Sequence, residues 1–115
     1  MSFLLLCDFV WVQFYNNPPC SIGTLGFNLS LQSWSQTLSS SKARLYLGVP
    51  AWPGADKTTY KNIGTAHSIE SVAQNVKGMR LANFGGIMFW DGPEGMLNKD
   101  DGKDIIAWAK TGLAT

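Results

Sequence analysis

Three apolar stretches of the sequence carry or precede aromatic and amide side chains of the kinds that bind neutral, hydroxyl-rich ligands. The residues are Gln13, Tyr15, Asn16, Trp52 and Trp90. Aromatic rings stack on the apolar faces of sugar rings, whereas amides and phenols exchange hydrogen bonds with hydroxyl and acetamido groups. The pattern therefore predicts a binding site for a neutral carbohydrate.

Four of these residues also have an ordinary structural interpretation to be weighed. Trp90 and Tyr15 fit core positions, since large aromatic residues are usually well buried. Asn16, followed by a second Asn and two prolines, fits a turn at least as well as a ligand. Trp52 lies in a loop, where packing explains it less easily, and exposed aromatic residues mark binding sites. The sequence alone leaves both interpretations open.

The stretches that position these side chains are predicted to be three buried strands, over residues 9–15, 44–49 and 86–90. All three are almost continuously apolar and rich in aromatic and β-branched residues. This composition is typical of parallel strands that are covered on both faces.

Helical periodicity follows each predicted strand. Apolar residues recur three and four positions apart from Phe27 to Leu38 and from Ile69 to Met79, with Ser68 as the expected N-cap. A last helix is expected over residues 104–110, ended by Gly112. The alternation, with roughly 35 to 40 residues between equivalent strand points, is typical of a βα barrel or a doubly wound sheet.

Three parallel βα units do not complete a barrel. They leave two sheet edges unpaired, and a barrel closes only with about eight strands. The pattern therefore predicts either a part of a larger barrel or a chain that finds its missing strands in another chain, with self-association through the open edges.

Composition restricts the function further. The chain has 115 residues, enough for one domain, and 45% of them are hydrophobic, which favours a packed core. Charged residues make up 15% and the net charge is +1, so there is no basic surface for nucleic acid. The single histidine, His67, is expected to be structural.

Residues 1–8 form an apolar N-terminal segment that is expected to include the start of the first strand. Asp8 interrupts the run, and no Lys or Arg precedes it, so a signal peptide is not expected. The run is also shorter than the about 20 apolar residues of a membrane helix. Localisation of the chain stays open.

A disulfide between Cys7 and Cys20 is not expected. A strand over residues 9–15 alone spans roughly 20 Å, whereas a disulfide requires Cα atoms within about 7 Å of each other.

Three motifs resemble class III chitinases of glycoside hydrolase family 18. Residues 11–20, Trp-Val-Gln-Phe-Tyr-Asn-Asn-Pro-Pro-Cys, resemble the sixth strand and loop of that family. Residues 47–51, Leu-Gly-Val-Pro-Ala, are similar to its seventh strand, and residues 85–90, Gly-Gly-Ile-Met-Phe-Trp, to its eighth. The resemblance implies an incomplete (β/α)8 TIM barrel over residues 9–115, the C-terminal portion of such an enzyme.

The resemblance also implies roles for the site residues. Tyr15 would hold the N-acetyl group of the substrate as it attacks the anomeric carbon, with Gln13 and Asn16 lining the cleft and Trp90 forming its floor. Chitin or N-acetylglucosamine oligomers would be the ligands, and no cofactor or metal is expected. The parent would hydrolyse β-1,4-N-acetylglucosamine polymers by substrate-assisted retaining catalysis, and such proteins are usually secreted.

The sequence departs from the family at the catalytic acid. The family carries Asp-x-x-Asp-x-Asp-x-Glu after its fourth strand, and no set of acidic residues here has that spacing. Without a general acid, protonation of the leaving group is lost, a factor of about 10² to 10⁴. The isolated chain is therefore predicted to be an inactive, partial chitinase-like domain.

The alternative is a non-catalytic chitin- or glycan-binding module that uses Trp90, Tyr15 and Trp52. An unrelated nucleotide-binding sheet is disfavoured, because a Gly-rich loop would have to follow the first strand.

Overall fold

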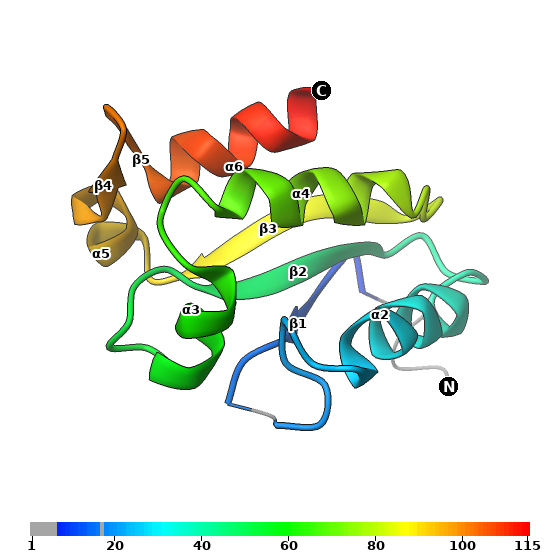
Figure 1. Ribbon diagram of the computed structural model, residues 1–115. Helices are drawn as coiled ribbons and strands as arrows, with labels where there is room; N and C mark the ends of the chain where they lie inside the picture. The colour runs from blue at the N-terminus through cyan, green and yellow to red at the C-terminus, as the bar shows by residue number, and fades with distance from the viewer. Residues whose placement is uncertain (1–6, 17) are drawn as a thin grey trace.

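The computed structural model describes residues 7–16 and 18–115, and its framework is a parallel sheet of three strands (Figure 1). Strand β1 (Phe9–Gln13) pairs with β2 (Arg44–Pro50), which pairs with β3 (Phe84–Trp90), in the order β1-β2-β3. The parallel strands and the α/β class confirm the predicted alternation. The sheet is open, since β1 and β3 are its two edges.

A helix follows each strand along the chain. These are α2 (Gly26–Thr37), α4 (Ile69–Gly78) and α6 (Ile105–Ala114). Helices α4 and α6 lie side by side along the sheet (Figure 1). Three shorter features were not predicted: α3 (Lys57–Ile63) after β2, α5 (Gly92–Leu97) after β3, and the hairpin of β4 (Lys99–Asp100) with β5 (Lys103–Asp104).

The core lies between the sheet and the helices. Leu45, Leu47 and Val49 alternate along β2 and are fully buried, together with Leu31 of α2 and Ile69 of α4. Because side chains alternate across a strand, residues 45, 47 and 49 define the face that the helices cover.

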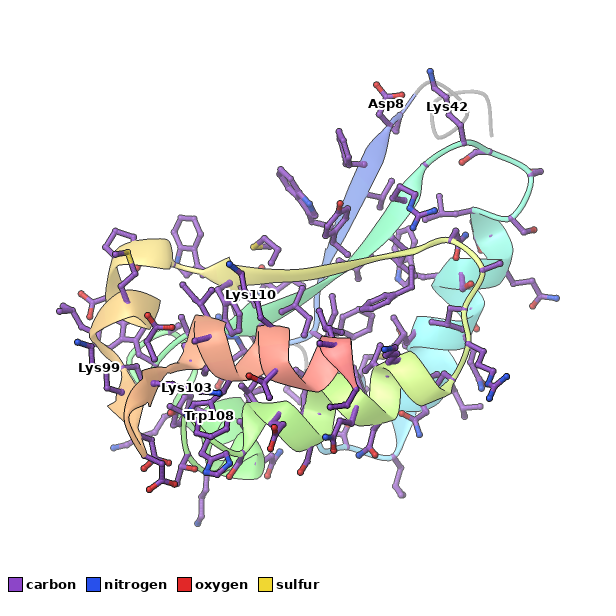
Figure 2. The ribbon with its side chains drawn as sticks, turned by 90° about the horizontal axis from the view of Figure 1, so that it is seen from above. Asp8, Lys42, Lys99, Lys103, Trp108 and Lys110 are labelled. Carbon is purple, nitrogen blue, oxygen red and sulfur yellow. The ribbon has the colours of Figure 1, made fainter. Side chains whose placement is uncertain are left out.

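The opposite face of the sheet is uncovered, which corrects the expectation of strands buried on both faces. Figure 2 shows that α2, α4 and α6 lie on one side of the sheet. On the other side Phe9 and Trp11 are 60% and 62% exposed, and both make edge-to-face contacts with Tyr46. The apolar composition of the strands could not reveal this, since nothing in the described part of the chain packs there.

The ends of the elements also differ from prediction. Strand β1 is shorter than residues 9–15, and β3 begins earlier, at Phe84, with an irregularity in its pairing opposite Leu45 and Tyr46. Ser68 occupies the N-cap of α4 but makes no cap bond, because its hydroxyl accepts a hydrogen bond from the Thr65 amide instead.

Gly112 does not end the last helix, so that expectation was wrong. It lies within α6 and is buried against α4, where a Cβ would be 2.5 Å from the Glu70 carbonyl oxygen. Gly112 therefore serves the close approach of two helices rather than a helix terminus.

Two other expectations concern the N-terminal part of the chain. Cys7 and Cys20 are not joined by a disulfide, as predicted. Of the predicted apolar segment 1–8, residues 1–6 lie outside the described residues. Among residues 7–16 and 18–115, no helix is both long and apolar enough to span a bilayer.

Candidate functional site

The predicted site residues lie at or just beyond the carboxyl ends of the three strands. Because the strands are parallel, these ends all lie at the same end of the sheet. Gln13 is in register with Gly48 of β2, and Pro50 is in register with Trp90 of β3. The Ala51 amide donates to the Trp90 carbonyl over 2.9 Å. Ligand sites of α/β folds lie at the carboxyl ends of the strands, so the topology places these residues at the end of the sheet where a site is expected.

Tyr15 combines a buried ring with a protonated hydroxyl. The residue is only 5% exposed, which agrees with the core interpretation of its ring. Burial raises the pKa of Tyr15, so the hydroxyl remains protonated at neutral pH and can donate a hydrogen bond. No buried side-chain oxygen or nitrogen of the described residues lacks a partner.

Gln13 and Asn16 contribute to the structure of the turn after β1. The side-chain amide of Gln13 donates to the Tyr15 carbonyl over 2.9 Å. Asn16 has a positive φ of 52°, and its side-chain amide donates to the Ala55 carbonyl over 3.4 Å. Asn16 therefore has a structural role in this turn, and both amides hold the segment that contains Tyr15.

The two tryptophans differ in their surroundings. Trp90 is 58% exposed at the end of β3, and its peptide bond to Asp91 is cis. Trp52 is 36% exposed and folds over its own loop, where a Cβ on Gly54 would lie 2.2 Å from the indole ring. Trp90 thus offers the larger free surface, while Trp52 is partly occupied by packing within its loop.

Two residues that support the site were missed by the sequence analysis. Asp56 accepts hydrogen bonds from the amides of Thr58 and Thr59 at the start of α3, and from the Asn16 amide. An Asp just before a helix is a recognisable N-cap, but no helix was predicted there. The side-chain amide of Asn98 lies 2.9 Å from the Ala51 carbonyl and 2.7 Å from the Tyr60 hydroxyl. No local pattern indicates that role.

A second polar cluster surrounds His67, just before α4. Its imidazole stacks on Trp108 with centroids 3.6 Å apart, and Nδ1 lies 2.7 Å from the Asp101 carboxylate. Lys103 Nζ lies 4.4 Å from the centroid of the Trp108 ring, and Figure 2 shows these two residues close together. The Trp108 indole donates to the Asp100 carbonyl over 2.7 Å. These contacts agree with the structural role expected for His67.

Among the described residues, this cluster has side chains placed so that they could ligate a metal ion. Potential ligand atoms of His67, Asp100 and Asp101 lie within 4.8 Å of one another. However, Nδ1 of His67 is already engaged with Asp101, and Asp100 accepts a hydrogen bond from the His67 backbone amide. We therefore interpret the cluster as a structural connection between α4, the hairpin and α6.

The fold and the site together define an open parallel α/β sheet with aromatic and amide side chains at its carboxyl edge. No protein-family model matches the chain. An acidic endochitinase of Phaseolus angularis is 41% identical over 86 residues, which cover 75% of this chain and 28% of that protein. Endochitinase 3 of Metarhizium robertsii is 37% identical over 102 residues, covering 89% of this chain and 31% of its own length. Endochitinase A of Emericella nidulans is 35% identical over 104 residues, covering 83% and 10%.

The chain is therefore homologous to the class III endochitinases of glycoside hydrolase family 18 and forms a partial chitinase-like region. This confirms the resemblance inferred from the three strand motifs. The chain spans less than a third of the length of each of these three relatives.

Proposed function

We propose that residues 9–115 correspond to strands six to eight of a family 18 chitinase barrel, with residues 1–8 leading into the first of these strands. In this proposal the chain binds chitin or N-acetylglucosamine oligomers but does not hydrolyse them by itself. The proposed ligand-binding residues are Gln13, Tyr15, Asn16, Trp52 and Trp90. The parallel strand order and the chitinase relatives support this assignment.

The exposed indole of Trp90 is the observation that carries the proposal. On the helix-covered face of β3, Ile87 and Phe89 pack against the core, whereas Trp90 is 58% exposed at the end of the strand. A large aromatic ring left open at a strand end supplies the flat apolar surface on which a pyranose ring stacks.

Tyr15 supplies the complementary polar contact. Its protonated hydroxyl can donate to the acetamido oxygen of an N-acetylglucosamine unit. In a complete barrel, such a contact would orient the acetamido group for substrate-assisted retaining hydrolysis, the exception to the scheme with two carboxylates. The sequence contains no Asp-x-x-Asp-x-Asp-x-Glu, so we expect this chain to contribute binding without proton donation.

Binding of tetra-N-acetylchitotetraose, measured by calorimetry with retention on chitin beads, tests the proposal. We expect Trp90→Ala to weaken binding by about tenfold or more, the effect of removing a central aromatic contact. Trp11→Ala is the matched control, because Trp11 is 62% exposed on the uncovered face of β1 but is not among the proposed binding residues. Equal loss in both variants, or none in Trp90→Ala, would contradict the proposal.

The same samples distinguish the alternative of an independent glycan-binding module. Retention of the isolated chain as a monomer favours such a module over a segment that binds only within a complete barrel. Release of reducing sugar from chitin by the isolated chain would overturn the non-catalytic part of the proposal.

A further inference from the structure

Asp56 connects two loops that are distant in the sequence. Its carboxylate accepts hydrogen bonds from the Thr58 amide at 3.1 Å, the Thr59 amide at 3.3 Å and the Thr59 hydroxyl at 2.7 Å, all within α3. It also accepts a hydrogen bond from the backbone amide of Asn16, which lies 40 positions earlier in the chain. One side chain therefore caps a helix after β2 and holds the turn after β1.

The turn that Asp56 holds has a backbone conformation that requires support. Asn16 has a φ of 52°, in the left-handed region that few residues other than Gly adopt. Among the other residues, Asn is one of those that adopt it most readily. A second bond, from the Asn16 side chain to the Ala55 carbonyl, joins the same two loops. Tyr15 is the residue immediately before Asn16.

Side chains that line the cavity beside Asp56 are hydrogen-bonded to other parts of the protein. The cavity measures about 360 Å³ and is lined by Pro18 and by residues that carry hydroxyl, amide or carboxylate groups. The Thr24 hydroxyl donates to the Ser21 carbonyl over 2.7 Å, and the Asn62 side chain donates to the Ile22 carbonyl over 3.2 Å. Because these donors are engaged within the protein, the cavity resembles a joint between loops more than a ligand site.

The carboxylate of Asp56 is ionised under neutral conditions. Burial acts to raise its pKa, but hydrogen bonds from Asn16, Thr59 and Thr58 outweigh burial and lower the pKa. Hydrogen bonds to an ionised acceptor are shorter and stronger than those between neutral groups. Asp56 is therefore suited to fix a turn as well as to begin a helix.

We propose that Asp56 is a positioning residue, which sets the conformation of the Tyr15–Asn16 turn and thereby the placement of Tyr15 and Asn16 toward the glycan. This inference rests on the proposed function for its consequence in binding. Its structural part, the coupling of Asp56 to the Asn16 turn, is testable without any ligand.

The decisive variant is Asp56→Ser. Serine is a good N-cap, so it retains the start of α3, but its side chain is too short to reach Asn16 as well. Asp104→Ser is the matched control, because Asp104 caps α6 through the Ala107 amide. Two-dimensional amide spectra of the full chain report the chemical shift of Asn16 and its HN–Hα coupling, which depends on φ.

In the wild type and in Asp104→Ser, the Asn16 amide resonance should titrate with an apparent pKa below the ordinary Asp value of 3.8. In Asp56→Ser the titration should disappear and the coupling should change, with affinity for tetra-N-acetylchitotetraose about tenfold lower. An unchanged Asn16 resonance in Asp56→Ser would overturn the inference, as would a changed turn with unchanged affinity. If the wild type binds no oligomer, the proposed function fails, whereas the coupling of Asp56 to Asn16 is decided by the spectra alone.

Discussion

His67 and Trp108 stack with their ring centroids 3.6 Å apart and their planes inclined by 17°. His67 precedes α4 and Trp108 lies in α6, so the stack joins the two helices that lie side by side. Asp101 in the intervening hairpin lies 2.7 Å from Nδ1 of the same imidazole. The hydrogen bond to Asp101 raises the pKa of His67 against the opposing effect of burial, and the charges of Asp101 and Glu70 act in the same direction as the hydrogen bond.

Stability should therefore decrease as the pH rises through the titration of His67. In the folded chain the pKa of His67 lies above the ordinary value of 6.5, so His67 binds its proton more tightly in the folded chain than in the unfolded chain. The stabilisation is fully present below the unfolded pKa and is lost as the pH rises through the folded pKa. Urea unfolding at about pH 5.5 and about pH 8.5, on either side of the ordinary His pKa, should give a larger free energy of unfolding at the lower pH.

Two variants assign that pH dependence to the cluster. His67→Gln removes the titrating group, and Asp101→Asn removes the largest cause of the raised pKa, so both should flatten the difference between the two pH values. Asp56 titrates below 3.8 and does not contribute in this window. An unchanged pH dependence in His67→Gln would assign the effect to other groups.

Gly112→Ala should destabilise the chain although it replaces a glycine inside a helix. Helix propensity alone favours Ala by about 1 kcal/mol, but the new Cβ would lie 2.5 Å from the Glu70 carbonyl oxygen and 2.7 Å from Ala73 Cβ. Overpacking of this kind costs about 1 to 3 kcal/mol. Gly78→Ala in α4 is the control, because nothing lies within 4 Å of its Cβ position. In thermal unfolding, the Tm of Gly112→Ala should fall and that of Gly78→Ala should rise. A raised Tm for Gly112→Ala would contradict the close packing of α4 and α6.

The framework of the fold was predictable because it depends on strong local patterns. The alternation of apolar strands with helices of regular periodicity gave the three parallel units from the sequence. Gly112 was misassigned because a helix-ending glycine and a helix-packing glycine look alike until the neighbouring helix is placed. The uncovered face could not be predicted either, since aromatic residues such as Trp11 and Tyr46 are typical of a core whether or not another element covers them.

The candidate site was predictable in its location but not in its support. Residue types at strand ends predicted Tyr15 and Trp90 as site residues, and the parallel topology places both at the same end of the sheet. The roles of Asp56 and Asn98 depend on hydrogen bonds to Asn16 and Ala51, which are about 40 or more positions away in the sequence. No local spacing encodes such contacts.

The uncovered sheet face leads to a prediction about self-association. Phe9 and Trp11 are each at least 60% exposed beside Tyr46, and soluble monomers rarely leave large contiguous apolar patches open. We expect the apparent mass of the chain in light-scattering chromatography to rise above 12.6 kDa with concentration. The double variant Phe9→Ser with Trp11→Ser should reduce that rise.

The control for this experiment is a pair of exposed apolar residues on the other side of the molecule. Leu25, just before α2, is fully exposed and Leu29 within α2 is 69% exposed, so Leu25→Ser with Leu29→Ser removes a similar kind of surface. The edge-to-face contacts with Tyr46 contribute about 0.5 to 1.5 kcal/mol each, and circular dichroism must first show that the sheet variant is folded. If the helix pair reduces association as much as the sheet pair does, general surface hydrophobicity rather than the uncovered face drives assembly.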